Sequence, residues 1–230
     1  MRNPQPSTPR RPSRLAHLRP HLAGLALFVA CAAAQAAGIP PTGALEFTVL
    51  RNGSEVGHHS VVFSHQGDRV DVAVRTSVNV KIPLVGISVY HFEHEGRESW
   101  RDGSLVALTS TTDDDGTAHS LDVRRESEGL VVRSDVTEHT SGPGAIPASL
   151  WNPALVQQTA LLNTLDGTMM PVTVADLGAE SITVHGQPVQ ARHYAVSGGL
   201  ARDVWYDSAG VLVQVRFKAK DDSDIQYVLR

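Results

Sequence analysis

Cysteine is nearly absent from this 230-residue chain, and the single one, Cys31, lies close to the N-terminus. One thiol cannot form an internal disulfide, and paired-cysteine zinc sites are excluded as well. The sequence also lacks a His-Glu-x-x-His pair, a Gly-x-Ser-x-Gly nucleophile elbow and a glycine-rich phosphate loop that leads into a helix. We therefore predict no catalytic residues, no metal site and no cofactor.

An apolar run long enough to span a bilayer is missing too. The stretch Leu22–Ala30, which follows several arginines and precedes Ala34-Gln35-Ala36, is too short for that. A basic start, a short apolar run and small residues before a cleavage point are typical of a secretory signal peptide. We predict a signal peptide over residues 1–36 and a periplasmic or secreted mature protein without a transmembrane segment. A lipoprotein anchored through Cys31 is the alternative, because Phe28–Cys31 forms an imperfect lipobox.

Positive charge is scarce in the rest of the chain. Without residues 1–36, 15 Lys and Arg face 24 Asp and Glu, which gives a net charge of −9. No cluster of basic residues stands out. Nucleic acids and anionic membrane surfaces are therefore excluded as expected partners.

Helical periodicity is rare as well, and alternation of apolar and polar residues takes its place. Asn52-Gly53 lies between two alternating runs, which is the strongest short-range signal of a β-hairpin. Residues 201–230 predict a three-stranded antiparallel meander, and turns recur about every ten residues in between. We predict an irregular segment over Glu138–Pro147. Asn152 followed by Pro153 predicts a short helix over residues 153–158.

Nine histidines follow residue 36, and they suggest a metal site only if their spacing is ignored. His58 and His59 are adjacent in a predicted strand, and His91 and His94 are three residues apart. Each pair therefore projects to opposite faces of the sheet. This spacing argues against a metal site.

Aromatic residues make up only 5% of the chain. Those on or beside the predicted strands have two interpretations: a ligand-lining wall inside a curved sheet, or ordinary core packing. Under the first interpretation the candidate ligand-binding residues are Tyr90, Trp100, Trp151, Trp205 and Tyr206.

Several short motifs carry a resemblance to a known family. They are Trp205-Tyr206-Asp207, Glu98–Gly103, Leu150–Asn152 and Ile225–Leu229, together with Arg51–Gly57 and Thr111–Gly116. From about Gly43 to Arg230 the chain resembles the secreted bacterial family called domain of unknown function 6134. The resemblance implies an exported β-rich protein without an assigned activity.

These observations predict an all-β fold: one domain over residues 37–230, built as a large twisted antiparallel meander that forms a half-open or closed barrel-like sheet. The predicted function is non-enzymatic binding of a lipid-like or apolar small molecule in the concave face of this sheet. Two alternatives stay open, a module that binds another envelope protein and an uncharacterised hydrolase. A one-residue slip reverses every side chain of a strand, so the sequence leaves open which faces point inward.

Overall fold

Fourteen strands form one antiparallel sheet in this computed structural model, which describes residue 1 and residues 37–81 and 87–230. The predicted signal peptide, with Cys31, lies outside the described residues. The strands are β1 (Ala44–Arg51), β2 (Ser54–Gln66), β3 (Arg69–Lys81), β4 (Ser88–Arg101), β5 (Ser104–Asp114), β6 (Thr117–Arg125), β7 (Leu130–Ser134), β8 (Glu138–Ser141), β9 (Ala160–Leu162), β10 (Met169–Val184), β11 (Gln187–Gly198), β12 (Arg202–Asp207), β13 (Leu212–Lys218) and β14 (Asp224–Leu229).

The strand order is that of a meander whose first and last strands meet in the middle. The order runs from β8 back to β1, then from β14 back to β9, and β1 pairs with β14 through Phe47 opposite Leu229. The two edge strands, β8 and β9, do not pair with each other, so the sheet is not closed. This confirms the predicted all-β, half-open architecture.

Local turn chemistry explains much of this order. Asn52 and Gly53 both have positive φ, 50° and 81°, as the predicted two-residue hairpin turn requires. Asn152 caps the only helical turn of the described residues, η1 (Pro153–Gln157), by accepting a 2.9 Å bond from the backbone of Ala154. The short helix predicted over residues 153–158 is therefore confirmed.

The segment between β8 and β9, residues 142–159, links the two sheet edges; we call it the crossing segment. The amide of Ala148 donates to Leu162 of β9, and the amide of Leu162 donates to Ile146, both at 2.9 Å. The predicted irregular segment over Glu138–Pro147 is wrong in its first four residues, which form β8. Edge pairing with β7 supplies the order that the polar sequence did not reveal.

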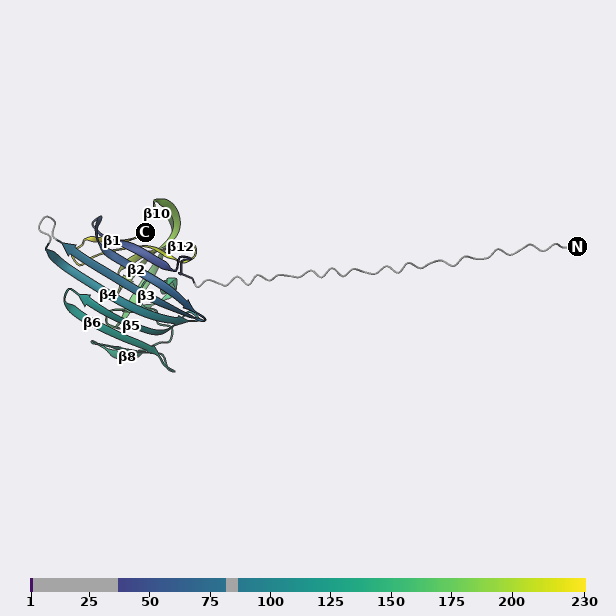
Figure 1. The fold of residues 1–230 in the computed structure, drawn as a ribbon, viewed down its shortest axis with the longest axis horizontal. Helices are drawn as coiled ribbons and strands as arrows, with labels where there is room; N and C mark the ends of the chain where they lie inside the picture. Colours follow the sequence, from purple (N-terminus) through teal and green to yellow (C-terminus); the bar gives the residue numbers. More distant parts are fainter. Residues whose placement is uncertain (2–36, 82–86) are drawn as a thin grey trace. The chain divides into compact units, whose positions relative to one another are not determined.

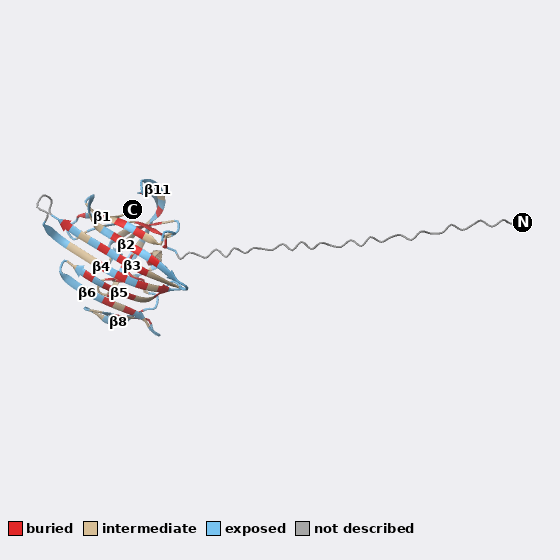
Figure 2. Cartoon of the chain, viewed as in Figure 1, coloured by how far each residue is buried: buried red, intermediate tan, exposed pale blue. Residues whose placement is uncertain are grey.

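The hydrophobic core lies between the two halves of the sheet, β1–β8 and β9–β14. Figure 1 shows β1 to β6 side by side as one wall, with β10 and β12 behind it. Figure 2 shows buried and exposed residues alternating along the strands of this wall. Core residues come from both halves and from the crossing segment, including Phe47, Val123, Leu155, Val204 and Leu212. No helix within the described residues has the length and apolar character needed to cross a membrane.

A second, smaller core lies on the opposite face of β12 and β13. This core consists of Val184, Ala191, Trp205 and Val213. Val184 and Ala191 belong to the half of the β10–β11 hairpin that contains its turn, so this half, which we call the far half, covers the outer face of β12 and β13. A bulge between Asp176 and Gly178 interrupts the register of the hairpin, and bulges of this kind bend strands. In β13 the sequence alternation, which would place Val211, Val213 and Val215 on one face, fails for a separate reason. The register between β12 and β13 shifts between Trp205 and Tyr206, and Val213 lies in the outer core while Leu212 and Val215 lie in the inner one.

One close backbone contact yields a prediction about stability. A Cβ atom on Gly57 would lie 1.9 Å from the carbonyl oxygen of Ser77 and 2.8 Å from the Cα of Val78 on the paired strand. We expect Gly57→Ala to lower the free energy of unfolding by about 1–3 kcal/mol, because β2 and β3 must separate. Urea unfolding followed by circular dichroism measures this. Gly142→Ala is the control, since its Cβ would meet nothing within 4 Å; equal losses in both variants would contradict the prediction.

Candidate functional site

A buried carboxyl group joins the crossing segment to the sheet. Glu98 of β4 is only 2% exposed, and its Oε2 accepts bonds from the indole nitrogens of Trp100, at 2.7 Å, and Trp151, at 3.0 Å. Burial raises the pKa of Glu98, and the two indoles and Ser149 act in the opposite direction. The Ser149 hydroxyl is buried nearby but has no partner at hydrogen-bonding geometry. Glu98 is therefore part of the core, and it lines neither of the two hollows described below.

A row of four inward side chains crosses strands β2 to β5. His59, Thr76, His94 and Thr112 are successive cross-strand neighbours, and all four are buried. Nδ1 of His59 lies 2.8 Å from Oγ1 of Thr76, and Nδ1 of His94 lies 2.8 Å from Oγ1 of Thr112. Burial lowers the pKa of His59 to about 3, with a contribution from His94, and the pKa of His94 to about 4. Both rings are neutral at pH 7.

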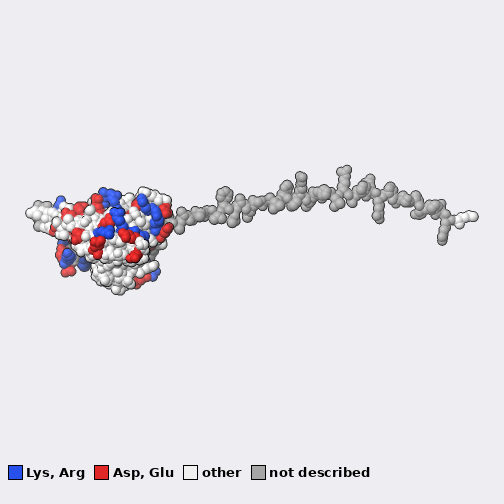
Figure 3. Space-filling model, turned by 90° about the horizontal axis from the view of Figure 1, so that it is seen from below, with Lys and Arg blue, Asp and Glu red and all other residues white. Residues whose placement is uncertain are grey.

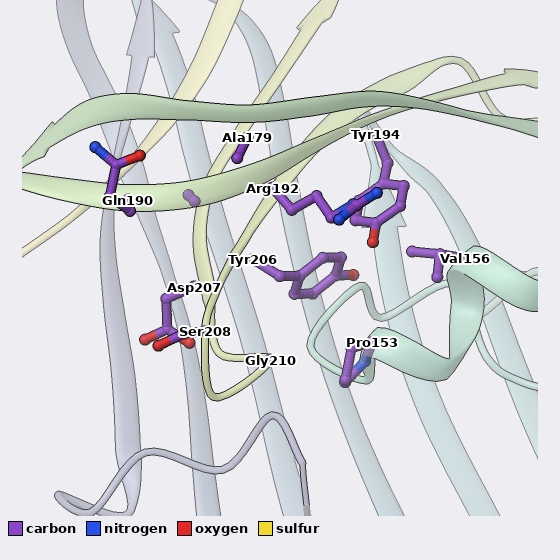
Figure 4. A pocket seen from close by; sticks show the side chains of 11 residues that line it. Pro153, Val156, Ala179, Gln190, Arg192, Tyr194, Tyr206, Asp207, Ser208 and Gly210 are labelled. Atoms are coloured by element: carbon purple, nitrogen blue, oxygen red, sulfur yellow. The ribbon is translucent and has the colours of Figure 1, made fainter.

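The tyrosine pocket is a hollow of about 400 Å³ between η1, the β10–β11 hairpin and the β12–β13 turn. Figure 4 shows the rings of Tyr194 and Tyr206 projecting toward Val156 and Pro153, with Arg192 beside them. The two rings are 6.3 Å apart. The Tyr206 hydroxyl donates to Leu150 at 2.6 Å, whereas the Tyr194 hydroxyl has no partner in the described part of the chain.

The rim of this pocket is polar and its walls are mostly apolar. Arg192 forms an ion pair with Asp176 in which one oxygen, Oδ2, lies 2.8 Å from Nε and 2.6 Å from Nη2, and this partner raises the pKa of Arg192. Ala179 and Val156 present only carbon atoms to the hollow. An arrangement of aromatic and aliphatic walls with a few polar groups suits a small amphipathic molecule.

A second hollow of about 640 Å³ has a different character. Its lining includes Asp203, Arg216, Lys218 and Asp224. Lys218 and Asp224 already form an ion pair at 2.7 Å. An apolar ligand would desolvate these charges without replacing their partners, so the larger hollow fits such a ligand less well.

The outer face of β12 carries a polar cluster around a stacked ring pair. His193 lies on Trp205 with 4.0 Å between ring centroids and 17° between planes. Its Nδ1 is 3.2 Å from a Glu180 oxygen, and its Nε2 is 2.9 Å from an Asp203 oxygen. The Trp205 indole also donates to Glu180. Both ring nitrogens of His193 are therefore engaged by carboxylates.

The structure separates the five aromatic residues proposed from the sequence. Trp100 and Trp151 pack edge to face in the core, 5.4 Å apart, and Trp205 lies on the outer face. Tyr90 is the third residue of β4, is 37% exposed and donates to Asp114. Tyr206 alone of the five lines the tyrosine pocket. Ligand binding by these residues stays a prediction.

Two features of these sites were missed by sequence reasoning. The spacing along each strand correctly places His58 and His59, and likewise His91 and His94, on opposite faces. It does not reveal that His59 and His94, on different strands, lie in the same row of the inner face, because that depends on the pairing of β2, β3 and β4. Tyr194 and Arg192 are two residues apart on β11, and both line the pocket beside η1, a neighbourhood that no local pattern of the sequence indicates. Within residues 37–81 and 87–230, no group of three or more His, Cys, Asp or Glu is placed to hold a metal ion.

Charge is distributed evenly over the face of the molecule seen in Figure 3. Blue Lys and Arg side chains alternate with red Asp and Glu on this face, without a broad area of one sign. A nucleic acid would require a continuous basic stripe. The absence of a nucleic-acid partner remains a prediction from the net charge.

Comparisons with known proteins give a family and a fold. A family model described as "Domain of unknown function (DUF6134)" matches residues 47–230. No curated protein is significantly similar to the chain. Solved structures do match, among them a β-barrel-like protein of domain of unknown function DUF1849 from Brucella abortus, with 11% identity, a TM-score of 0.54, and 81% of this chain and 94% of that chain covered. At this identity the likeness concerns the fold.

Glu98 gives a prediction about alkaline pH. Its folded pKa lies above the unfolded value, so its contribution to stability is complete below pH 4.5 and is lost as pH rises through the folded pKa. We expect Glu98→Gln to keep both indole bonds on the amide oxygen and to become progressively more stable than the wild type as pH rises from 5 to 9. Urea midpoints across this range test it, with the exposed Glu126→Gln as control. A constant loss of stability at every pH would contradict it.

The two buried histidines give the opposite dependence. Their folded pKa values, about 3 and about 4, lie below the unfolded 6.5, so stability is lost as pH falls from 6.5 toward these values. As pH falls from 6.5 to 5, each buried ring should lower the free energy of unfolding by about 2 kcal/mol. We expect His59→Asn and His94→Asn each to remove about that much of the acid destabilisation. The exposed His65→Asn is the control, and an unchanged pH slope in both buried variants would rule this explanation out.

Proposed function

Because this chain belongs to the DUF6134 family, whose description names no activity, we propose a function from the geometry of its sites: it binds a small amphipathic molecule without transforming it. The observation that carries the proposal is the tyrosine pocket. Its volume of about 400 Å³ falls within the range of small-molecule sites, roughly 300–1,000 Å³. The predicted signal peptide adds the location, which we propose to be periplasmic or secreted.

The lining suggests how such a molecule would lie. Its apolar part would contact Val156, Pro153 and the faces of the two tyrosine rings, because burying carbon surface there removes it from water. Its polar end would reach the Tyr194 hydroxyl, which has a donor and an acceptor to offer. Arg192 and Asp176 neutralise each other at the rim, so the pocket does not require a charged ligand.

The two alternatives from the sequence receive less support. Edge strands of four and three residues, β8 and β9, offer little backbone for a partner strand to pair with. A hydrolase would need a nucleophile beside a free base. His193 has carboxylates on both ring nitrogens, and it has no serine or threonine partner among the described residues. The pairs His59–Thr76 and His94–Thr112 do join an imidazole to a hydroxyl, but both are buried and line neither hollow.

The test begins with the natural ligand and continues with a defined probe. Native mass spectrometry of the protein purified from its own host, followed by organic extraction, would detect and identify a bound molecule. Isothermal titration with 1-decanol, an uncharged amphiphile, then measures the site directly. We expect Val156→Trp to weaken decanol binding at least tenfold because the indole fills the pocket. Tyr194→Phe should weaken it about two- to tenfold through one lost hydrogen bond.

The control is Val136→Trp, which adds the same side chain at a valine that is 56% exposed and outside the pocket. It should bind decanol as the wild type does. A clean apo mass together with no measurable decanol binding by the wild type would refute the proposed function. Equal weakening by both tryptophan variants would show that decanol does not occupy the tyrosine pocket.

A further inference from the structure

Arg202 is a cation on the inner face of the sheet without a carboxylate partner. It precedes Val204 and Tyr206 on the inward side of β12, and it is half-buried. Its Nη1 donates to the carbonyl of Ala201 at 2.7 Å. Within residues 37–81 and 87–230 no Asp or Glu forms an ion pair with it. A guanidinium has five N–H donors, so most of its hydrogen-bonding capacity is unused.

Aromatic rings surround this cation. Its Cζ lies 3.5 Å from the centroid of Phe217, and Phe217 is 6.1 Å from Tyr227. Stacking on Phe217 orients the guanidinium and leaves the N–H groups at its edge free for an acceptor. Burial lowers the pKa of Arg202, and Tyr227 acts in the opposite direction.

Tyr227 connects the cation to the histidine row. Its ring centroid is 5.1 Å from His59 and 6.4 Å from Phe47. Tyr227 and Arg202 both lie against the Phe217 ring, which places the phenol near the cation. Burial raises the pKa of Tyr227, and Arg202 acts in the opposite direction. Unlike the Tyr90 hydroxyl, which donates to Asp114, the Tyr227 hydroxyl has no partner among the described residues. The site therefore presents a second free donor beside a cation.

We propose that Arg202 and Tyr227 form a binding site for the anionic group of a small molecule, a carboxylate or a phosphate. A half-buried cation is costly unless an opposite charge accompanies it, and no carboxylate of the described residues forms an ion pair with Arg202. A planar guanidinium matches both anions through two parallel hydrogen bonds. The neutral rings of His59 and His94 add apolar surface rather than competing charge.

This site is separate from the tyrosine pocket. Arg202 and Tyr206 are four residues apart on the same face of β12, which corresponds to about 13 Å. Val204 and Val215, both fully buried, lie between them. The proposal goes beyond the proposed function, and either can fail while the other stands.

The experiment compares three probes by isothermal titration and thermal unfolding at low ionic strength: inorganic phosphate, acetate and decanoate. We expect at least one probe to bind the wild type and to raise its thermal unfolding midpoint. We expect Arg202→Met to weaken that binding at least tenfold. Arg202→Lys should retain part of it, and Tyr227→Phe should weaken it a few-fold. Preference for decanoate over acetate would indicate an anion with an acyl chain, and preference for phosphate a free or esterified phosphate.

Arg216→Met is the matched control, because Arg216 is exposed on the opposite face of the neighbouring strand. It should bind the probes as the wild type does. Arg202→Met should unfold at the same or a higher midpoint without ligand, since it removes an unpaired cation. The proposal is overturned if no probe binds the wild type, if both methionine variants lose binding equally, or if Arg202→Met lowers the midpoint as strongly as a core deletion does.

Discussion

The fold depends on the bond pair that joins Glu98 to the indoles of Trp100 and Trp151. One indole comes from the same strand and the other from the crossing segment, so a single oxygen fixes that segment inside the sheet. Trp151 also packs against Phe63 at 5.2 Å. Without this anchoring, the interior between β1–β7 and β12–β14 would lack the side chains that fill it. A buried polar group with specific donors thus sets where the segment lies, and the surrounding apolar residues supply most of the stability.

The same constraint divides the inner face into regions of different chemistry. Around Glu98 the crossing segment fills the space, and Leu155, Leu161 and Leu162 are fully buried. Farther along the strands the inner face carries the histidine row and Arg202, where polar side chains replace leucine. A core needed only for stability would continue with apolar residues. In the histidine row each imidazole lies at hydrogen-bonding distance from a threonine hydroxyl, which offsets part of the cost of burial, whereas Arg202 has no such carboxylate or hydroxyl partner among the described residues.

The sequence predicted the turns and the helix cap better than it predicted which strands and side chains lie side by side. Asn52-Gly53 fixed a turn because both positions need positive φ, and Asn152-Pro153 fixed a cap, since each depends on two adjacent residues. The pairing of β1 with β14 and the joining of His59 to His94 depend on register between distant or neighbouring strands, which no local pattern specifies. The register shift between Trp205 and Tyr206 in the β12–β13 pair is a further case. It separates Val213 from Val215, which simple alternation would place on the same face.

Two backbone features explain why aromatic residues alone were an incomplete guide to the site. Trp205 lies between Val204 and Tyr206, which both face the inner core, so alternation along β12 turns Trp205 to the outer face, where His193 stacks on it. The β10–β11 hairpin, whose register is interrupted between Asp176 and Gly178, brings Arg192 and Tyr194 beside η1, and the tyrosine pocket lies there. The sequence leaves open which face of β12 points inward and where the hairpin lies against η1, so it could give the aromatic residues without their surroundings.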